Sequence, residues 1–357
     1  MVHTAHDPSL LSSRSYNGAE TIAAFADPAN ELRALTSGCG VFDLRWRAKF
    51  SAGGQDRVRW LNAMVTNAIK DLPANRGNYN FVLNPQGRIL GDLYIYNRGE
   101  YLLLDTDRSQ LETVRNTLKR FIIMDKVELA DSNLSAIAVC GPKSESVLSA
   151  AGIDVSGMAP LEVRDAAVNE SAVTLVRGPE NKGAWYEVWA AQEQLLDPKM
   201  RNTGAYLGTP LEPIWEKLTS GGAQPVGTDA LEQWRILCGI PNYGQDIRER
   251  DLPQETEQTQ ALNFTKGCYI GQEIVERIRS RGQVHRQFAG FEFHHALPQP
   301  GKFEENGRLL ADLTSVAEIG GRKIGLGYVR RENGAPGTKL TLGGVEATVS
   351  KLPFHVA

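Results

Sequence analysis

Three strand-like runs follow one another between residues 81 and 105, and their short connections constrain the fold more than any other feature of the chain. Phe81–Asn84 and Ile89–Tyr96 are separated by a Pro-Gln-Gly turn, and the segment Asn97-Arg98-Gly99 then leads toward a third run, Tyr101–Asp105. Strands joined by so few residues must pair antiparallel, because a parallel pair needs a crossover of a dozen or more residues. We therefore predict an antiparallel sheet in this region.

Helical and strand patterns alternate over the first 220 residues. Apolar residues recur at helical spacing in Gln55–Val65 and Leu111–Phe121, and further helices are predicted at Lys143–Ala151, Glu193–Arg201 and Pro210–Thr219. Strands are predicted at Asn133–Val139, Ala172–Val176 and Ala184–Ala190. This mixture predicts an α+β architecture with antiparallel sheets, each covered by helices on one face.

The pattern changes at Arg286. The run RQFAGFEF alternates, glycine and proline recur every few residues, and strand-like runs follow at Lys323–Arg330, Lys339–Leu342 and Val345–Leu352. These features predict a small C-terminal β-barrel of about 70 residues. We accordingly divide the chain into residues 1–281 and residues 282–357.

One cysteine, Cys268, lies between a Lys266-Gly267 turn and a predicted helix, Gln272–Arg281. A helix N-terminus and a nearby ammonium both favour thiolate, so a thiol pKa of about 8.5 is expected to fall toward 7. The alternative is an inert, buried cysteine, because free cysteine is among the most buried residue types. The other three cysteines are predicted to be core residues, and their wide spacing supports neither a disulfide framework nor a metal site: Cys39, Cys140 and Cys238.

The segment Lys266–Glu273, KGCYIGQE, resembles the signature of the YgfZ-type folate-binding proteins. That family is related to the glycine-cleavage T-protein, an aminomethyltransferase, and its mitochondrial members serve iron–sulfur protein maturation. Looser similarities follow the family's order at Gly40–Leu44, Gly77–Tyr96, Arg235–Asp246 and Leu252–Glu255. The resemblance implies a three-domain, ring-like fold whose central opening holds folate and whose N-terminal domains interleave along the sequence.

The cofactor that the resemblance implies is tetrahydrofolate or a one-carbon derivative of it. This molecule has a flat pterin with a donor-rich edge, an aryl linker and an anionic glutamate tail, so its site needs a carboxylate, an aromatic slot and a cation. Asp92 is the expected carboxylate, because it matches the second of two adjacent acidic residues in T-proteins. Gly91 occupies the other position, which argues against aminomethyl transfer. The alternative for Asp92 is a solvated strand residue.

Four more residues are expected at the folate. Tyr79 and Tyr243 are candidates for packing on its rings, with their hydroxyls free to hydrogen-bond at the rim. The resemblance places Arg235 at a folate carboxylate, which suits its fork geometry, and Glu187 at the pterin. The alternatives are two core tyrosines and an ion pair of Arg235 with Glu232.

Four residues around the cysteine motif have expected structural roles. Gly267 and Gly271 are expected to adopt backbone conformations, or to allow close approaches, that a side chain would block. Gln272 and Glu273 lie where they can cap the predicted helix.

The other motif residues are closer to the proposed chemistry. Lys266, with Cys268 and Asp92, is a candidate catalytic residue that lowers the thiol pKa or binds an anion. Tyr269 is expected to anchor the turn to the core. Arg277 either lines a path to Cys268 or lies on a solvated helix face.

Composition excludes some classes of function. The 357 residues are 41% hydrophobic and carry a net charge of −3, so nothing in the overall charge favours direct DNA binding. No apolar run approaches the 18 residues of a membrane span, so no membrane partner is expected. The first twenty residues include Asp7, Glu20 and a single arginine, which fits neither a signal nor a transit peptide, and a cytoplasmic location is expected.

Three functions are compatible with these observations. The favoured one is a tetrahydrofolate-binding protein that assists iron–sulfur protein assembly or repair, with iron–sulfur proteins as clients and Cys268 as the functional thiol. The first alternative is a folate-dependent aminomethyl or methyl transferase, whose chemistry needs a folate amine and a carboxylate but no protein thiol. The second is a non-catalytic binding module linked to tRNA modification, which no sequence feature separates from the favoured function.

Overall fold

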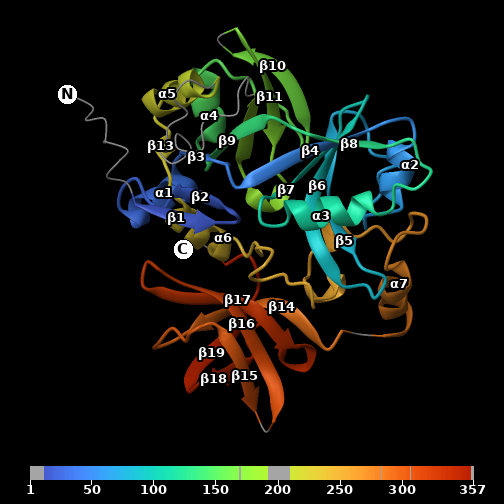
Figure 1. Ribbon diagram of the computed structural model, residues 1–357. Coiled ribbons are helices and arrows are strands. Elements are labelled where there is room, and N and C mark those ends of the chain that lie inside the picture. The colour runs from blue at the N-terminus through green and yellow to red at the C-terminus, as the bar shows by residue number, and fades with distance from the viewer. Residues whose placement is uncertain (1–11, 169, 192–209, 283, 306, 355–357) are drawn as a thin grey trace, which may run out of the picture.

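The computed structural model describes residues 12–354 except 169, 192–209, 283 and 306, so the helix predicted at 193–201 lies outside the described residues. Two sheets with flanking helices form the larger part of the molecule, and the C-terminal strands form a separate lobe below it (Figure 1). None of the described helices is long and apolar enough to cross a membrane.

The first sheet has five strands in the order β5-β6-β7-β4-β8, and all its pairs are antiparallel. This confirms the antiparallel succession predicted for residues 81–105. Helices α2 and α3 cover one face, where Trp60, Leu61 and Val114 meet Leu93 and Ile95 of the sheet. The elements are β4 (Arg47–Gly53), α2 (Arg57–Asn62), β5 (Arg76–Leu83), β6 (Ile89–Asn97), β7 (Leu102–Asp107), α3 (Leu111–Lys119) and β8 (Glu128–Asp131).

The second sheet has six strands in the order β10-β11-β12-β9-β3-β13. Its one parallel pair among the described strands joins β13 to β3. Helices α4 and α5 cover one face through Val147, Leu148, Ile214 and Leu218. The elements are β3 (Gly40–Asp43), β9 (Leu134–Cys140), α4 (Ser144–Ala150), β10 (Val163–Val168), β11 (Ser171–Arg177), β12 (Trp185–Ala191), α5 (Glu212–Ser220) and β13 (Gln224–Pro225).

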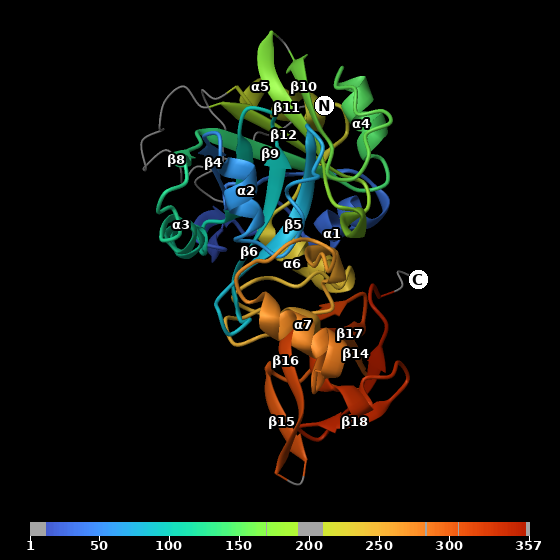
Figure 2. The same ribbon diagram turned by 90° about the vertical axis from the view of Figure 1, so that its right-hand side faces the viewer.

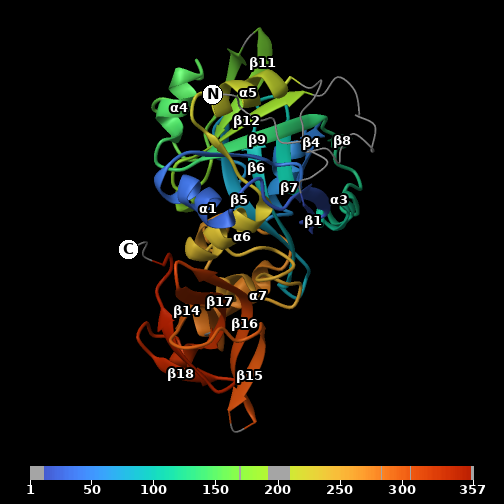
Figure 3. The same cartoon turned by 90° about the vertical axis from the view of Figure 1, so that its left-hand side faces the viewer.

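The uncovered faces of the two sheets lie toward each other, and this arrangement positions the site. Tyr96 and Leu103 of the first sheet share one core with Phe42, Trp185 and Trp189 of the second. Because side chains alternate along a strand, residues 92, 94 and 96 of β6 face this interior, while residues 91, 93 and 95 face α2 and α3. Figures 2 and 3 show both sheets above the C-terminal lobe from two sides.

Helices α1 (Pro28–Ser37) and α6 (Thr228–Leu237) border the shared core through Leu32, Leu35, Leu231 and Trp234. Asp27 caps α1, because its carboxylate accepts a hydrogen bond from the Ala29 N–H at 2.8 Å. A hairpin of β1 (Ser13–Tyr16) and β2 (Ala19–Ile22) lies beside α6. Short 3₁₀ turns occur at η2 (Glu180–Lys182), η4 (Pro253–Glu255), η5 (Thr259–Ala261) and η6 (Arg331–Asn333).

The C-terminal lobe confirms the predicted barrel-like sheet. Six antiparallel strands follow the order β15-β16-β17-β14-β19-β18. Phe303 of one edge strand and Leu340 and Leu342 of the other belong to the same core, so the sheet is nearly closed. The elements are α7 (Gln272–Arg281), which precedes the lobe, then β14 (Arg286–Phe293), β15 (Gly301–Glu305), β16 (Arg308–Ile319), β17 (Arg322–Arg330), β18 (Lys339–Leu342) and β19 (Val345–Ser350).

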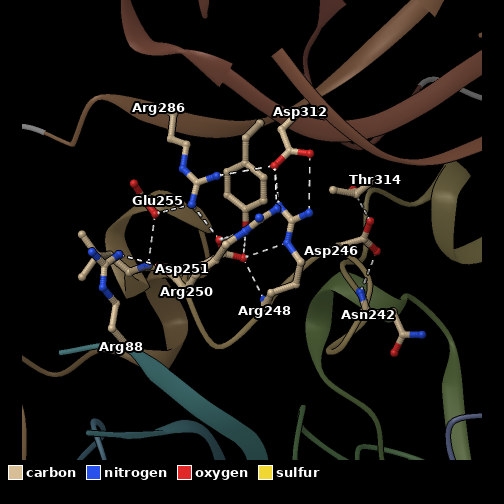
Figure 4. Close-up of polar contacts among 12 residues, drawn as sticks. Arg88, Asn242, Asp246, Arg248, Arg250, Asp251, Glu255, Arg286, Asp312 and Thr314 are labelled. Atoms are coloured by element: carbon tan, nitrogen blue, oxygen red, sulfur yellow. Dashed lines mark hydrogen bonds and ion pairs between the residues drawn. The ribbon is translucent and has the colours of Figure 1, made fainter. Parts of the chain in front are cut away.

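A buried polar network joins this lobe to the rest of the chain (Figure 4). Asp251 is fully buried and accepts hydrogen bonds from Arg286 of β14 at 2.6 Å and Tyr328 of β17 at 3.2 Å. Arg248 donates to Asp312 of β16 at 2.8 Å. Charge-assisted hydrogen bonds restrict the geometry of the side chains that they join. This network therefore fixes the position of the C-terminal lobe relative to the segment that follows α6.

Candidate functional site

An open cavity lies between the inner faces of the two sheets, and α6 with the segment 240–243 forms its third side. Its empty space is about 1020 Å³ when the open solvent at its mouth is included. The five residues expected at a folate all line it: Tyr79, Asp92, Glu187, Arg235 and Tyr243.

Asp92 is held in the cavity by two side chains. The Tyr79 hydroxyl donates to Asp92 Oδ2 at 2.5 Å, and the Gln110 amide donates to Asp92 Oδ1 at 2.7 Å. Gln110 in turn accepts the Asp92 N–H at 2.9 Å. A carboxylate has about four lone-pair positions, so Asp92 can still accept hydrogen bonds from a ligand.

Tyrosines form the wall beside Asp92. The Tyr79 and Tyr94 ring centroids are 5.0 Å apart, and those of Tyr94 and Tyr96 are 6.5 Å apart. Burial raises the pKa of Tyr79 and of Tyr94, and the negative charge of Asp92 acts in the same direction on both. Both phenols therefore stay protonated at neutral pH and present apolar faces with hydroxyl donors at their ends.

Glu187 lies on the opposite wall, on β12. Its two carboxylate oxygens accept the indole N–H groups of Trp185 at 2.8 Å and Trp189 at 2.7 Å. Trp185, Glu187 and Trp189 follow one another at two-residue intervals, which places their side chains on the same face of the strand. The indoles fix the carboxylate in place, and its remaining lone pairs are available inside the cavity.

Gly91 faces away from the cavity. A Cβ at this position would lie 2.5 Å from Val114 Cγ2 and 3.0 Å from Gln110 Oε1, on the side covered by α3. Positions 91 and 92, which match the two adjacent acidic residues of T-proteins, therefore face opposite sides of β6. Only position 92 contributes its side chain to the cavity.

Arg235 is saturated by protein acceptors. Its Nε donates to Glu232 at 2.7 Å, Nη1 donates to Asp246 at 2.6 Å and to the Ile240 carbonyl at 3.1 Å, and Nη2 donates to Glu232 and to Ser315 at 2.9 Å. A guanidinium has five N–H donors, and all five have partners here. Arg235 therefore belongs to a structural ion-pair network. This network includes the ion pair with Glu232 that was expected as the alternative to folate binding.

The Cys268 motif is a separate feature of the molecule. Of the described residues, neither Cys268 nor Lys266 lines the cavity. The Cys268 side chain is exposed on the turn before α7, which begins at Gln272 as predicted. The turn is attached to the end of α2, where the Ile270 N–H donates to the Ala63 carbonyl at 3.2 Å.

Lys266 fastens this turn to the loop after α2. Its Nζ donates to the main-chain carbonyls of Asn62 at 2.6 Å, Val65 at 2.6 Å and Asn67 at 2.7 Å. An ammonium has three donors, so none is left for a thiolate or a bound anion. Burial lowers the pKa of Lys266 to about 7.

The two motif glycines differ in their surroundings. Gly271 has φ +81°, and a Cβ there would lie 2.7 Å from the Asn84 carbonyl oxygen. Both the backbone conformation and the close approach at this position therefore require glycine, as expected. At Gly267 a Cβ would meet no atom within 4 Å and φ is not positive, so the expected constraint is not found.

The remaining motif residues lie as follows. Tyr269 is buried against the core that contains Phe81 and Leu83. Gln272 and Glu273 form the first turn of α7, where no side chain caps the helix at Gly271, and Arg277 is exposed.

The four cysteines differ in burial. Cys39 and Cys140 are buried, Cys238 is half-buried against the shared core, and Cys268 is exposed. Burial raises the pKa of Cys39 to about 11 and of Cys238 to about 12. Within the described residues, no group of three or more His, Cys, Asp or Glu side chains is arranged to hold a metal ion.

Several cavity residues were not found from the sequence. Tyr94 and Tyr96 follow Asp92 at two-residue intervals, so strand alternation is the signal that reveals them. Arg47 bridges Asp105 at 3.1 Å and Asp107 at 2.6 Å, and Lys182 contacts the cavity from a surface turn. No local pattern marks these last residues.

Comparison with known proteins agrees with this architecture. Residues 4–195 match the family described as the GCVT N-terminal domain, and the chain belongs to this family. An aminomethyltransferase from Rippkaea orientalis is 24% identical over 95% of this chain and 92% of its own length. An aminomethyltransferase from Bacillus subtilis is also 24% identical, over 95% and 94%.

The crystal structure of the glycine cleavage system aminomethyltransferase T from Bartonella henselae superimposes with a TM-score of 0.82. It covers 98% of this chain and 96% of its own, at 18% identity. The predicted T-protein fold, with antiparallel α+β sheets and a C-terminal barrel, is confirmed.

Proposed function

We propose that this chain binds a reduced folate in the cavity between its sheets and serves iron–sulfur protein maturation, with Cys268 as a functional thiol. The observation that carries the folate proposal is the cavity itself, in which Asp92 and Glu187 are fixed on opposite aromatic walls. The related aminomethyltransferases, similar over most of their length, support the same ligand.

The residues present fit such a ligand. The donor-rich edge of a pterin needs a carboxylate, which Asp92 or Glu187 supplies with lone pairs still open. Tyr79 and Tyr94 offer flat faces for the pterin and the aryl linker. A reduced folate supplies amines that carry one-carbon units, and the protein's part is to orient the folate and exclude water.

Binding is tested by following the intrinsic fluorescence of the full chain during titration with tetrahydrofolate. Trp46, Trp185 and Trp234 line the cavity, so a bound pterin is expected to quench their emission in a saturable way. Folic acid, whose pterin is flat and fully oxidised, serves as the comparison ligand. No saturable quenching by any reduced folate up to millimolar concentration would refute the folate proposal.

The maturation role rests on Cys268. Its thiol is exposed on a turn that Lys266 fastens to the α2 loop, and it does not share the cavity with the proposed folate. A thiol so placed can reach a macromolecular client, whose cluster would be cargo. Cys268→Ser is therefore expected to lower the activity of iron–sulfur enzymes in cells that depend on this protein, with folate affinity unchanged. Cys238→Ser is the matched control.

Aminomethyl transfer is the second candidate, and one observation favours it. Because Gly91 faces α3, the cavity retains the one carboxylate that this strand can direct into it. Incubation with tetrahydrofolate and an aminomethylated carrier protein separates the two functions. The maturation role predicts little formation of methylene-tetrahydrofolate, whereas turnover equal to that of an authentic aminomethyltransferase would promote the second candidate. A non-catalytic module linked to tRNA modification would share the folate site without turnover.

A further inference from the structure

The cavity needs a cation for the anionic part of a folate, and two of the three cations that line it in the described part of the chain are already paired. All five donors of Arg235 have protein partners, including Glu232 and Asp246. Arg47 forms ion pairs with Asp105 and Asp107. Redirecting either guanidinium to a ligand would leave a buried carboxylate without its partner, which is strongly unfavourable.

Lys182 is the exception. Among the described residues it has neither an ion pair nor a hydrogen bond from Nζ, although Nζ lies 4.2 Å from the ring centroid of Trp185 and 5.8 Å from that of Tyr94. Aromatic faces attract an ammonium and hold it in place without using its N–H donors. Burial lowers the pKa of Lys182, the direction expected for an ammonium that lacks a carboxylate partner.

The position of Lys182 also matters. It ends the 3₁₀ turn η2 (Glu180–Lys182), in which Glu180 and Asn181 are exposed, and Gly183 after it is exposed as well. Lys182 therefore reaches into the cavity from its solvent rim, whereas the Glu187 carboxylate is buried deeper on the same wall. A ligand with a neutral, flat head and an anionic tail fits this order, with the head at the carboxylates and the tail at the rim.

We propose that Lys182, and not Arg235, binds a glutamate-tail carboxylate of the folate. This inference rests on the proposed function and names the residue that selects for the tail. The tail carboxylates are the only formal negative charges on tetrahydrofolate at neutral pH. A charge-assisted hydrogen bond to them is about twice as strong as one to a neutral carbonyl of the pterin.

The test compares two ligands and three variants of the full chain. Tetrahydrofolate and the methylamide of tetrahydropteroic acid share the pterin and aryl groups, but in this tetrahydropteroate amide a neutral methylamide replaces the glutamate and its carboxylates. We expect Lys182→Gln to weaken tetrahydrofolate binding by roughly 10- to 100-fold and binding of the neutral amide by less than about 2-fold. Lys182→Arg, which keeps the charge, should bind tetrahydrofolate nearly as the wild type does. Lys119→Gln on the exposed end of α3 is the control for loss of a lysine.

The outcomes are distinct. Equal weakening of both ligands by Lys182→Gln would place Lys182 at the pterin and overturn the inference, and so would unchanged binding of both. If the wild type binds neither ligand, the proposed function itself fails. The unfolding midpoints of all variants are measured alongside. If Lys182→Gln does not fold, Lys182→Arg provides the test. Loss of the affinity that depends on the glutamate tail in Lys182→Arg would contradict the inference.

Discussion

Gly91 and Asp92 are neighbours in β6, yet they face opposite sides of the sheet. Asp92 accepts a hydrogen bond from Tyr79 inside the cavity, while a Cβ on Gly91 would lie 2.5 Å from Val114 Cγ2 under α3. A second carboxylate at position 91 would thus contribute nothing to the cavity directly. Gly91 therefore gives no geometric reason to exclude aminomethyl transfer.

Gly91→Asp is expected to destabilise the protein without strengthening folate binding. The new side chain would press on Val114 and on Gln110, and its charge would enter the packed region between the sheet and α3. Overpacking and an unpaired polar group together cost about 1–4 kcal/mol, which urea denaturation can measure. A variant as stable as the wild type, with tighter folate binding, would show that position 91 does reach the cavity.

The motif glycines give a matched pair of substitutions. Gly271→Ala forces a left-handed residue and brings Cβ within 2.7 Å of the Asn84 carbonyl oxygen, so a loss of about 1–3 kcal/mol in unfolding free energy is expected. Gly267→Ala meets no atom within 4 Å and should change stability by less than about 0.5 kcal/mol. Equal effects of the two changes would contradict this account of the turn.

Cys268 should be the first cysteine to react. It is exposed, whereas Cys39 and Cys140 are buried, and burial raises the pKa of Cys39 to about 11 and of Cys238 to about 12. With limiting iodoacetamide at neutral pH, peptide mass spectrometry is expected to find the label on Cys268 well before the others. Uniform labelling of all four cysteines would contradict the burial pattern.

Lys266 should make stability depend on pH. Burial lowers its pKa to about 7, while the unfolded chain keeps the ordinary lysine value of about 10.4. Between these values the unfolded state binds more protons, so the contribution of Lys266 to the unfolding free energy should rise with pH from 7 to 10. Urea denaturation of the wild type and Lys266→Met at several pH values isolates this contribution.

The three carbonyl acceptors of Lys266 act in the other direction, because they stabilise the ammonium. A difference between the wild type and Lys266→Met that does not change from pH 7 to pH 10 would mean that these acceptors hold the lysine protonated. Lys119→Met, at an exposed position on α3, is the control for removal of a lysine charge.

Local patterns were sufficient for much of the fold. The close succession of strands from residue 81, helix Gln272–Arg281 and the C-terminal strands β14, β17, β18 and β19 depend on turns and periodicity that short segments carry by themselves, whereas β15 and β16 were not predicted. Strand β3 (Gly40–Asp43) was not predicted, since it pairs with β9 and β13, which lie far from it in the sequence.

Some residues of the candidate site could likewise be predicted from local sequence patterns, and others could not. Asp92 and Tyr79 were identified from one predicted hairpin. The alternation of side chains along the same hairpin also indicates Tyr94. Arg47 and Lys182 could not be predicted, because their places depend on how segments far apart in the sequence pack around one cavity. The separation of Cys268 from that cavity is likewise a property of the tertiary structure, which the motif itself does not encode.

A reduced folate is proposed to bind in the cavity at Asp92, and calorimetric titration of the full chain with tetrahydrofolate measures this binding. We predict micromolar binding by the wild type, equivalent to about 8 kcal/mol. Asp92→Asn should weaken this binding by roughly 10- to 100-fold, because it removes a charged acceptor, and should leave the unfolding midpoint nearly unchanged. The exposed Asp71→Asn is the control. Absence of wild-type binding at millimolar ligand, or equal affinities of the wild type and Asp92→Asn, would contradict the binding of a reduced folate at Asp92.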